Sequence, residues 1–165
     1  MRVLDIDRIN RVAPYDVMFQ NGKYVFKTDA SIVFSVQFEQ ETELDNGYPV
    51  YWFHLINSES KPSPRDSKVR DTIICIIEEF FCDSPDVLLY LCDSAGGQQA
   101  MRNRLFLRWF DTYELKERFL ILNEKIITDG QEDYVSLIIR RNHPQLEEIS
   151  KYFQGIVALF KANKP

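Results

Sequence analysis

The alternation of apolar and polar residues is clearest in the first third of the chain. The segment SIVFSVQFEQ, residues 31–40, places an apolar side chain at every second position. This period of two predicts a strand with one face on a core and one face near water. The buried face would consist of Ile32, Phe34, Val36 and Phe38.

Turn residues separate this strand from its neighbours. Asn21-Gly22 lies between two short apolar runs, and Asn46-Gly47 follows the strand. An Asn-Gly pair between apolar runs is the strongest short-range signal of a β-hairpin. The next run, VYWFHLIN over residues 50–57, is apolar on both faces and predicts a strand covered on both sides. Together these segments predict an antiparallel meander.

The hydrophobic pattern becomes helical in the middle of the chain. Ser63 as N-cap and Pro64 at the first helical position predict a helix that runs to about Cys82. The apolar run VLLYLC, residues 87–92, predicts a buried strand, which leads into a second helix over residues 95–114. The remaining predicted elements are a hairpin around Asp129-Gly130 and a last helix that starts near His143-Pro144.

These elements predict an α+β fold. The sheet would be mainly antiparallel, made of the N-terminal meander plus the later strands, with three helices packed mostly on one face. The chain of 165 residues is predicted to be a single domain, 1–165. Residues 1–14 are polar and mixed, which is typical of a loosely attached N-terminal arm or of an added sheet edge.

The composition is that of a folded domain with an acidic excess. Hydrophobic residues make up 45% of the chain, enough for a core that needs no metal or disulfide. The formal net charge of −5 disfavours general binding to nucleic acid or to anionic membranes. Positive charge still gathers at Arg102, Arg104 and Arg108 and at the pair Arg140-Arg141. A solvated helix face and a charged strand end are the favoured interpretation of these clusters.

The cysteines and the termini bear on the cellular compartment. Cys75, Cys82 and Cys92 lie in apolar runs, which favours reduced thiols that serve as small core hydrophobes. The N-terminus has no apolar run of signal-peptide length, and no stretch approaches the roughly 18 apolar residues of a membrane span. The sequence therefore predicts a cytoplasmic protein without a membrane partner.

The stretch YLCDSAGGQQAMRNRLFLRWF, residues 90–110, is the main candidate for chemistry. A strand, a cysteine, a glycine-containing loop and an arginine-bearing helix resemble the phosphate loop of cysteine phosphatases. That loop requires an arginine six residues after the cysteine, and the residue six positions after Cys92 is Gln98. The signature fails at its decisive position, and a buried structural Cys92 is favoured.

A simpler anion site at the start of this helix is another interpretation. Backbone N–H groups in the first turn of a helix can bind a carboxylate or a phosphate. Helical geometry places Arg102 inside an apolar arc, where its charge needs a partner. A structural clamp with Asp93 is favoured over a pocket in which Arg102 awaits an anionic ligand. The apolar arc consists of Met101, Leu105, Trp109 and Tyr113, extended by Phe106 and Phe110. The candidate binding residues are Asp93, Ser94, Gly96, Gly97, Gln98 and Arg102.

Other catalytic templates are absent from the sequence. His54 and His143 lack the spacing of a zinc motif, and there is no Walker loop, GxSxG elbow or GxGxxG turn. We therefore predict no catalytic residue, no metal and no cofactor. Enzymatic activity stays open but is not favoured.

Two stretches carry a family resemblance. YVFKTDASIVFSVQF, residues 24–38, and the stretch at residues 90–110 resemble a family of small uncharacterised proteins from Bacteroides-type bacteria, a domain of unknown function. The resemblance covers most of residues 15–160 and makes the block at residues 93–110 the characteristic feature. It implies a compartment and an unnamed fold, and no mechanism.

Three functions follow as hypotheses. The first is a non-enzymatic cytoplasmic binding or interaction module, whose partner is another protein or a second copy of the chain. The second is an anion- or metabolite-binding protein, with or without enzymatic activity, that has its site at the start of the 95–114 helix. The third is weak nucleic-acid contact through the Arg104/Arg108 face, which the net charge disfavours.

Overall fold

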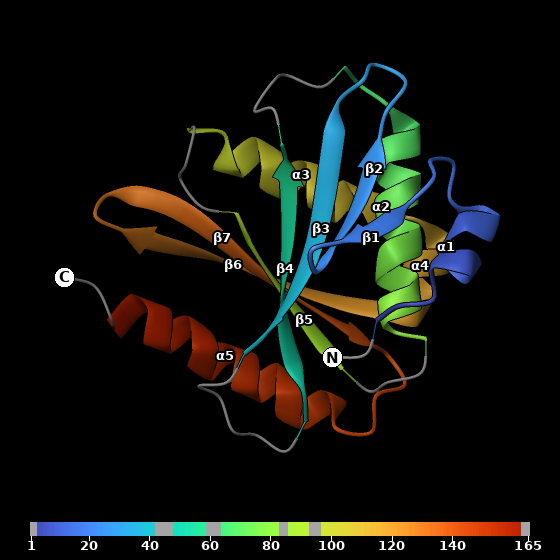
Figure 1. The fold of residues 1–165 in the computed structure, drawn as a ribbon. Helices are drawn as coiled ribbons and strands as arrows, with labels where there is room; N and C mark the ends of the chain where they lie inside the picture. Colours follow the sequence, from blue (N-terminus) through green and yellow to red (C-terminus); the bar gives the residue numbers. More distant parts are fainter. Residues whose placement is uncertain (1–2, 42–47, 59–63, 83–85, 93–96, 163–165) are drawn as a thin grey trace. The chain divides into compact units, whose positions relative to one another are not determined.

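The computed structural model describes residues 3–41, 48–58, 64–82, 86–92 and 97–162. The chain forms two compact units, and each is considered by itself. The N-terminal unit comprises residues 1–45 and 51–84, and the C-terminal unit comprises residues 46–50 and 85–165. The described residues contain seven strands and five helices, and every strand pair inside either unit is antiparallel (Figure 1). The predicted α+β class is confirmed.

The N-terminal unit contains the predicted meander. Asn21 and Gly22 have φ angles of 52° and 77°, the left-handed conformation that a two-residue hairpin turn requires. The predicted inner face of the strand at residues 31–40 is buried, as expected. The predicted turn at Asn46-Gly47 lies outside the described residues. The strands pair in chain order and are β1 (Met18–Gln20), β2 (Lys23–Lys27), β3 (Val33–Gln40) and β4 (Val50–Asn57), with Val50 assigned to the other unit.

Helix α2 (Ser67–Phe80) covers the inner face of this meander. Phe80 stacks on Phe38 with the ring centroids 4.7 Å apart. The helix begins later than the predicted Ser63, because Asp66 is the N-cap and its carboxylate accepts the Lys68 N–H at 2.9 Å. The outer face of β4 is less covered than predicted, since Ile56 is 39% exposed.

Helix α1 (Ile6–Val12) lies within the segment predicted to be an arm. Asp5 caps it, and Ile9 is buried. Arg8 donates to both carboxylate oxygens of Glu79 in α2, at 2.7 and 3.2 Å. The described part of this segment therefore packs onto the N-terminal unit.

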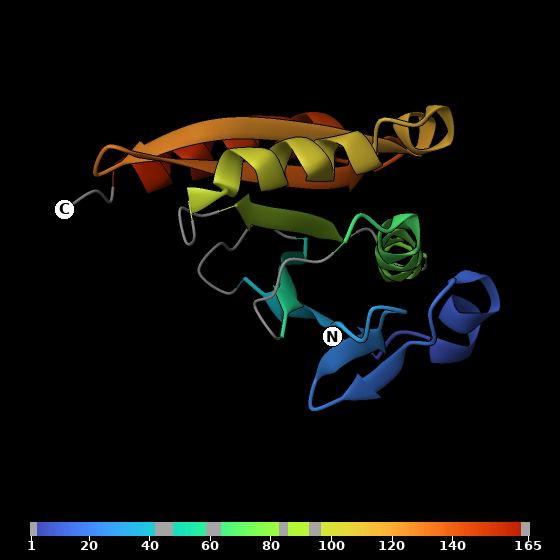
Figure 2. The same cartoon turned by 90° about the horizontal axis from the view of Figure 1, so that it is seen from above.

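The C-terminal unit contains three strands in the order β5 (Val87–Cys92), β7 (Gln131–Arg140) and β6 (Phe119–Thr128). Asp129 and Gly130, with φ of 51° and 75°, form the predicted hairpin turn. Five consecutive residues of β7, 135–139, are buried, which requires cover on both faces. Figures 1 and 2 show α3 (Gln99–Trp109) and α5 (Leu146–Ala162) on opposite sides of β6 and β7, whereas the sequence predicts helices mostly on one face.

Two further predictions need correction. The predicted 95–114 helix is divided into α3 and α4 (Tyr113–Arg118), because the Thr112 hydroxyl accepts the Leu115 N–H and starts a new helix. Cys92 is buried as predicted, but Cys75 is only half-buried and Cys82 is exposed. No helix in the described ranges is long and apolar enough to cross a bilayer.

Candidate functional site

The predicted anion site at the start of α3 is only partly described. Asp93, Ser94 and Gly96 lie outside the described residues, so the Asp93–Arg102 clamp stays a prediction. Gly97 is exposed and has a φ of 67°, which favours glycine. The N-cap position is Gln98, whose side chain makes no capping hydrogen bond.

The buried face of α3 differs from the predicted apolar arc. Met101 and Leu105 are 52% and 45% exposed, although the sequence places both inside the arc. The buried positions are Asn103, Phe106 and Phe110, and Arg102 is half-buried at the border.

A polar cluster with two buried members, Asn103 and Ser136, explains this rotation. The Asn123 amide of β6 donates to Asn103 Oδ1 at 2.8 Å and to Ser136 Oγ of β7 at 2.7 Å. The Asn103 amide donates back to Asn123 Oδ1 at 3.3 Å. Buried polar groups must be hydrogen-bonded to avoid a desolvation penalty, so this amide cluster (Asn103, Asn123 and Ser136) fixes which side of α3 meets the sheet.

Arg104 and Arg108 are exposed on α3, on the side away from the predicted apolar arc, as the sequence predicts. These two arginines border a groove of about 710 Å³, which we call the basic groove. Its floor includes the first residues of β6. The groove is lined by Arg104, Leu107, Arg108, Phe110, Asp111, Lys116, Phe119, Leu120, Ile121 and Arg141.

The charges around the basic groove are unevenly paired. Lys116 forms an ion pair with Asp111. Arg141 donates through Nε to the backbone carbonyl of Lys116. No carboxylate among the described residues forms an ion pair with Arg104 or Arg108. Four basic residues and one acid line the groove, a formal sum of +3.

The groove joins basic residues that are far apart in the sequence. Arg141 follows β7, more than thirty residues after Arg104 and Arg108. The sequence suggests two separate solvated clusters, and the fold brings one member of the second cluster to the first. Three guanidinium groups around one concavity can bind carboxylates or phosphates through paired N–H donors.

Residues 65–155, 91 of the 165 residues, match a family of unknown function, DUF6169. This chain belongs to that family. None of the curated proteins matches it.

The DUF6169 match contains every residue that lines the basic groove and all of the amide cluster. It also contains the stretch at residues 90–110 on which the family resemblance rests, whereas the stretch at residues 24–38 lies outside it. The resemblance to a domain of unknown function is thus confirmed.

The histidines of this DUF6169 chain have structural partners. His143 is buried, and its Nδ1 accepts the Gln145 N–H at 3.0 Å. His54 Nε2 lies 2.9 Å from Glu39 Oε2 in the N-terminal unit. Among the described residues, no three His, Cys, Asp or Glu side chains are grouped so that they could hold a metal ion.

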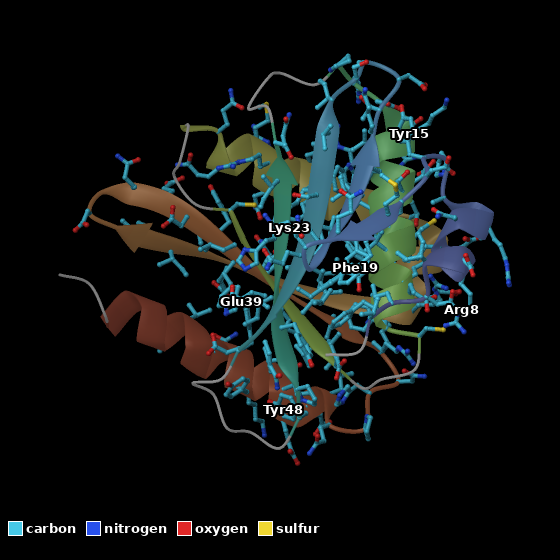
Figure 3. All side chains as sticks on the ribbon, viewed as in Figure 1. Arg8, Tyr15, Phe19, Lys23, Glu39 and Tyr48 are labelled. Carbon is cyan, nitrogen blue, oxygen red and sulfur yellow. The ribbon has the colours of Figure 1, made fainter. Side chains whose placement is uncertain are left out.

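A second polar cluster lies in the N-terminal unit. The Tyr15 hydroxyl donates to Asp66 and accepts the Asp29 N–H, and Lys68 forms an ion pair with Asp29 at 3.1 Å. The hydrogen bond from Tyr15 lowers the pKa of Asp66, and burial raises the pKa of Tyr15. Figure 3 shows Tyr15 near one end of α2 and Arg8 near the other. Every member of this cluster has a partner, which indicates a structural role.

Proposed function

We propose that this DUF6169 chain is a non-enzymatic interaction module of the bacterial cytoplasm, of Bacteroides-type origin, that binds an anionic partner in the basic groove. One observation carries the proposal. Arg104 and Arg108 line a concavity and have no ion-pair partner among the described carboxylates.

The physical argument concerns the cost of placing these charges together. Arg104 and Arg108 are four residues apart on α3, so their side chains are neighbours on the helix surface. Like charges at this spacing destabilise a helix by about 0.2–0.5 kcal/mol. A bound anion would attract both arginines and offset the repulsion between them. This supports a binding role for the two arginines over a purely structural one.

The test is an amide-resolved NMR titration with pyrophosphate as a probe anion. We expect changes in amide chemical shift that are confined to α3, α4 and the start of β6. The double variant Arg104→Gln/Arg108→Gln should lose these shifts. The matched control Arg11→Gln/Lys151→Gln removes two exposed positive charges elsewhere and should retain them. Shifts spread over the whole surface, or equal loss in both variants, would overturn the proposal.

The predicted site at the start of α3 is a separate hypothesis. Its described members are Gly97, Gln98 and Arg102. The absence of a side-chain cap from Gln98 supports it. In the same titration, this site would produce shifts at residues 97–100 that survive the Arg104→Gln/Arg108→Gln substitution.

A further inference from the structure

We infer that the anionic partner is an acidic peptide segment of another protein, in which carboxylate and apolar side chains alternate. The inference rests on the proposed function and specifies the partner of the same groove. Two features of the groove support the inference, namely the type of surface on its floor and the spacing of its arginines. The third support is the net charge of the whole chain.

The floor of the basic groove is aliphatic where it is accessible. Leu107 and Ile121 are half-buried residues of the groove lining, and Ile121 lies on the same face of β6 as Asn123, which contacts α3. Phe110 and Phe119 are only 3% and 6% exposed. Proteins that bind single-stranded nucleic acid stack bases on exposed aromatic rings, and the rings in this groove are not available for stacking. Leucine- or isoleucine-like side chains fit such a floor better.

The arginine spacing matches an extended peptide. Four residues of helix span about 6 Å, so Arg104 and Arg108 present two guanidinium groups at that interval. Alternate residues of an extended chain are about 6.6 Å apart and point to the same side. Carboxylates at positions i and i+2 can therefore meet the two arginines of α3. The side chain between them points the opposite way, toward Ile121 of β6.

The charge balance favours a partner with few charges. The groove carries a formal +3, whereas the whole chain carries −5. A long polyanion such as nucleic acid extends beyond the groove and meets the negative remainder of the surface. A short acidic segment places its charge inside the groove alone.

The experiment is fluorescence anisotropy with labelled peptides and one oligonucleotide. The probes are Asp-Leu-Asp-Leu-Asp-Leu, its counterpart with Ser in place of Leu, and a thymidine oligonucleotide of equal charge. We expect the Leu-containing peptide to bind at least about tenfold more tightly than either other probe. The variants Arg104→Gln/Arg108→Gln and Leu107→Gln should each weaken it about tenfold or more, while Arg11→Gln/Lys151→Gln should not.

The outcomes separate this inference from the proposed function. If pyrophosphate or the oligonucleotide binds at the groove and the Leu-containing peptide binds no better, the peptide inference is wrong and the anion site stands. If the Ser-containing peptide equals the Leu-containing one, the floor is not recognised and the inference also fails. If no probe perturbs the groove residues, both proposals are wrong. Circular dichroism of each variant checks that the fold is intact.

Discussion

The arginine Arg8 of the N-terminal unit and the arginines Arg104 and Arg108 of the C-terminal unit of this DUF6169 chain differ in how their charges are paired. In the N-terminal unit, Arg8 pairs with Glu79 and Lys68 pairs with Asp29, so cations and carboxylates satisfy one another. In the C-terminal unit, Arg104 and Arg108 line a groove without such partners among the described residues. The first set of charges joins elements of the fold, and the second is the set to which the proposed function assigns a ligand.

The largest expected effect is at the pair between α1 and α2. Arg8→Ala leaves the Glu79 carboxylate, which is 8% exposed, without its bidentate donor. Removing one partner of a buried charge pair is strongly destabilising, and the 40% exposure of Arg8 moderates the effect to about 2 kcal/mol. We expect a fall in melting temperature of about 4–8 °C in a thermal unfolding experiment.

The exposed Arg11 on the same helix provides the control for that prediction. Arg11→Ala should change stability by less than about 0.5 kcal/mol, because Arg11 forms no ion pair with any of the described residues. Equal losses in the two variants would mean that the Arg8–Glu79 pair does not hold α1 to α2.

The amide cluster under α3 should give the next largest effect. Asn123→Ala removes the donor to Asn103 and to Ser136, which are 5% and 1% exposed. Leaving buried polar groups unsatisfied costs about 1–3 kcal/mol, and we expect a loss toward the lower end from denaturant unfolding.

A double-mutant cycle with Asn103→Ala sharpens this prediction. If the two amides act as one unit, the double variant should lose less than the sum of the single losses. Strict additivity would mean that the cluster does not set the rotation of α3. Weaker peptide binding in Asn123→Ala is also expected, because the arginines of the groove depend on that rotation.

The hairpin turns and the orientation of α3 differ in how far the sequence could predict them. The hairpin turns at Asn21-Gly22 and Asp129-Gly130 were predictable because two adjacent residues with positive φ determine them. The orientation of α3 was not, because its apolar pattern alone favours burying Met101 and Leu105. The partner that decides the orientation, Asn123, lies twenty residues away on β6.

The groove was hidden from sequence reasoning for the same reason. The exposed arginines of α3 were visible as a cluster, and Arg141 was visible as part of another. These arginines lie around one groove because of where β7 ends relative to α3. No local sequence pattern predicts that position. A signal that could have pointed to the groove is the set Asn103, Phe106 and Phe110. Its i, i+3 and i+7 spacing marks one helix face and puts Arg104 and Arg108 outside it.

A smaller effect is expected at acidic pH from the Tyr15–Asp66 hydrogen bond. The folded-state pKa of Asp66 is lowered, so its contribution to stability is present above the unfolded pKa of about 3.9 and is lost as the pH falls through the folded pKa. Tyr15→Phe should be less stable than wild type at pH 7, and the gap should narrow as the pH falls below 4. Unfolding curves across this range measure it. A gap that does not change with pH would assign the loss to packing alone.

The smallest stability effect is expected for the arginines of the groove. The sign of this change in stability is the sharpest test of the difference between paired Arg8 and the groove arginines. Arg104→Gln/Arg108→Gln removes two neighbouring like charges and no ion pair with a described residue, so the free energy of unfolding should rise by about 0.2–0.5 kcal/mol at low salt. The gain should shrink as salt screens the repulsion. Arg8→Ala moves stability in the opposite direction, because its charge is paired. A clear loss of stability in the groove variant would mean that these arginines serve the fold, and the distinction between paired Arg8 and the groove arginines would fail.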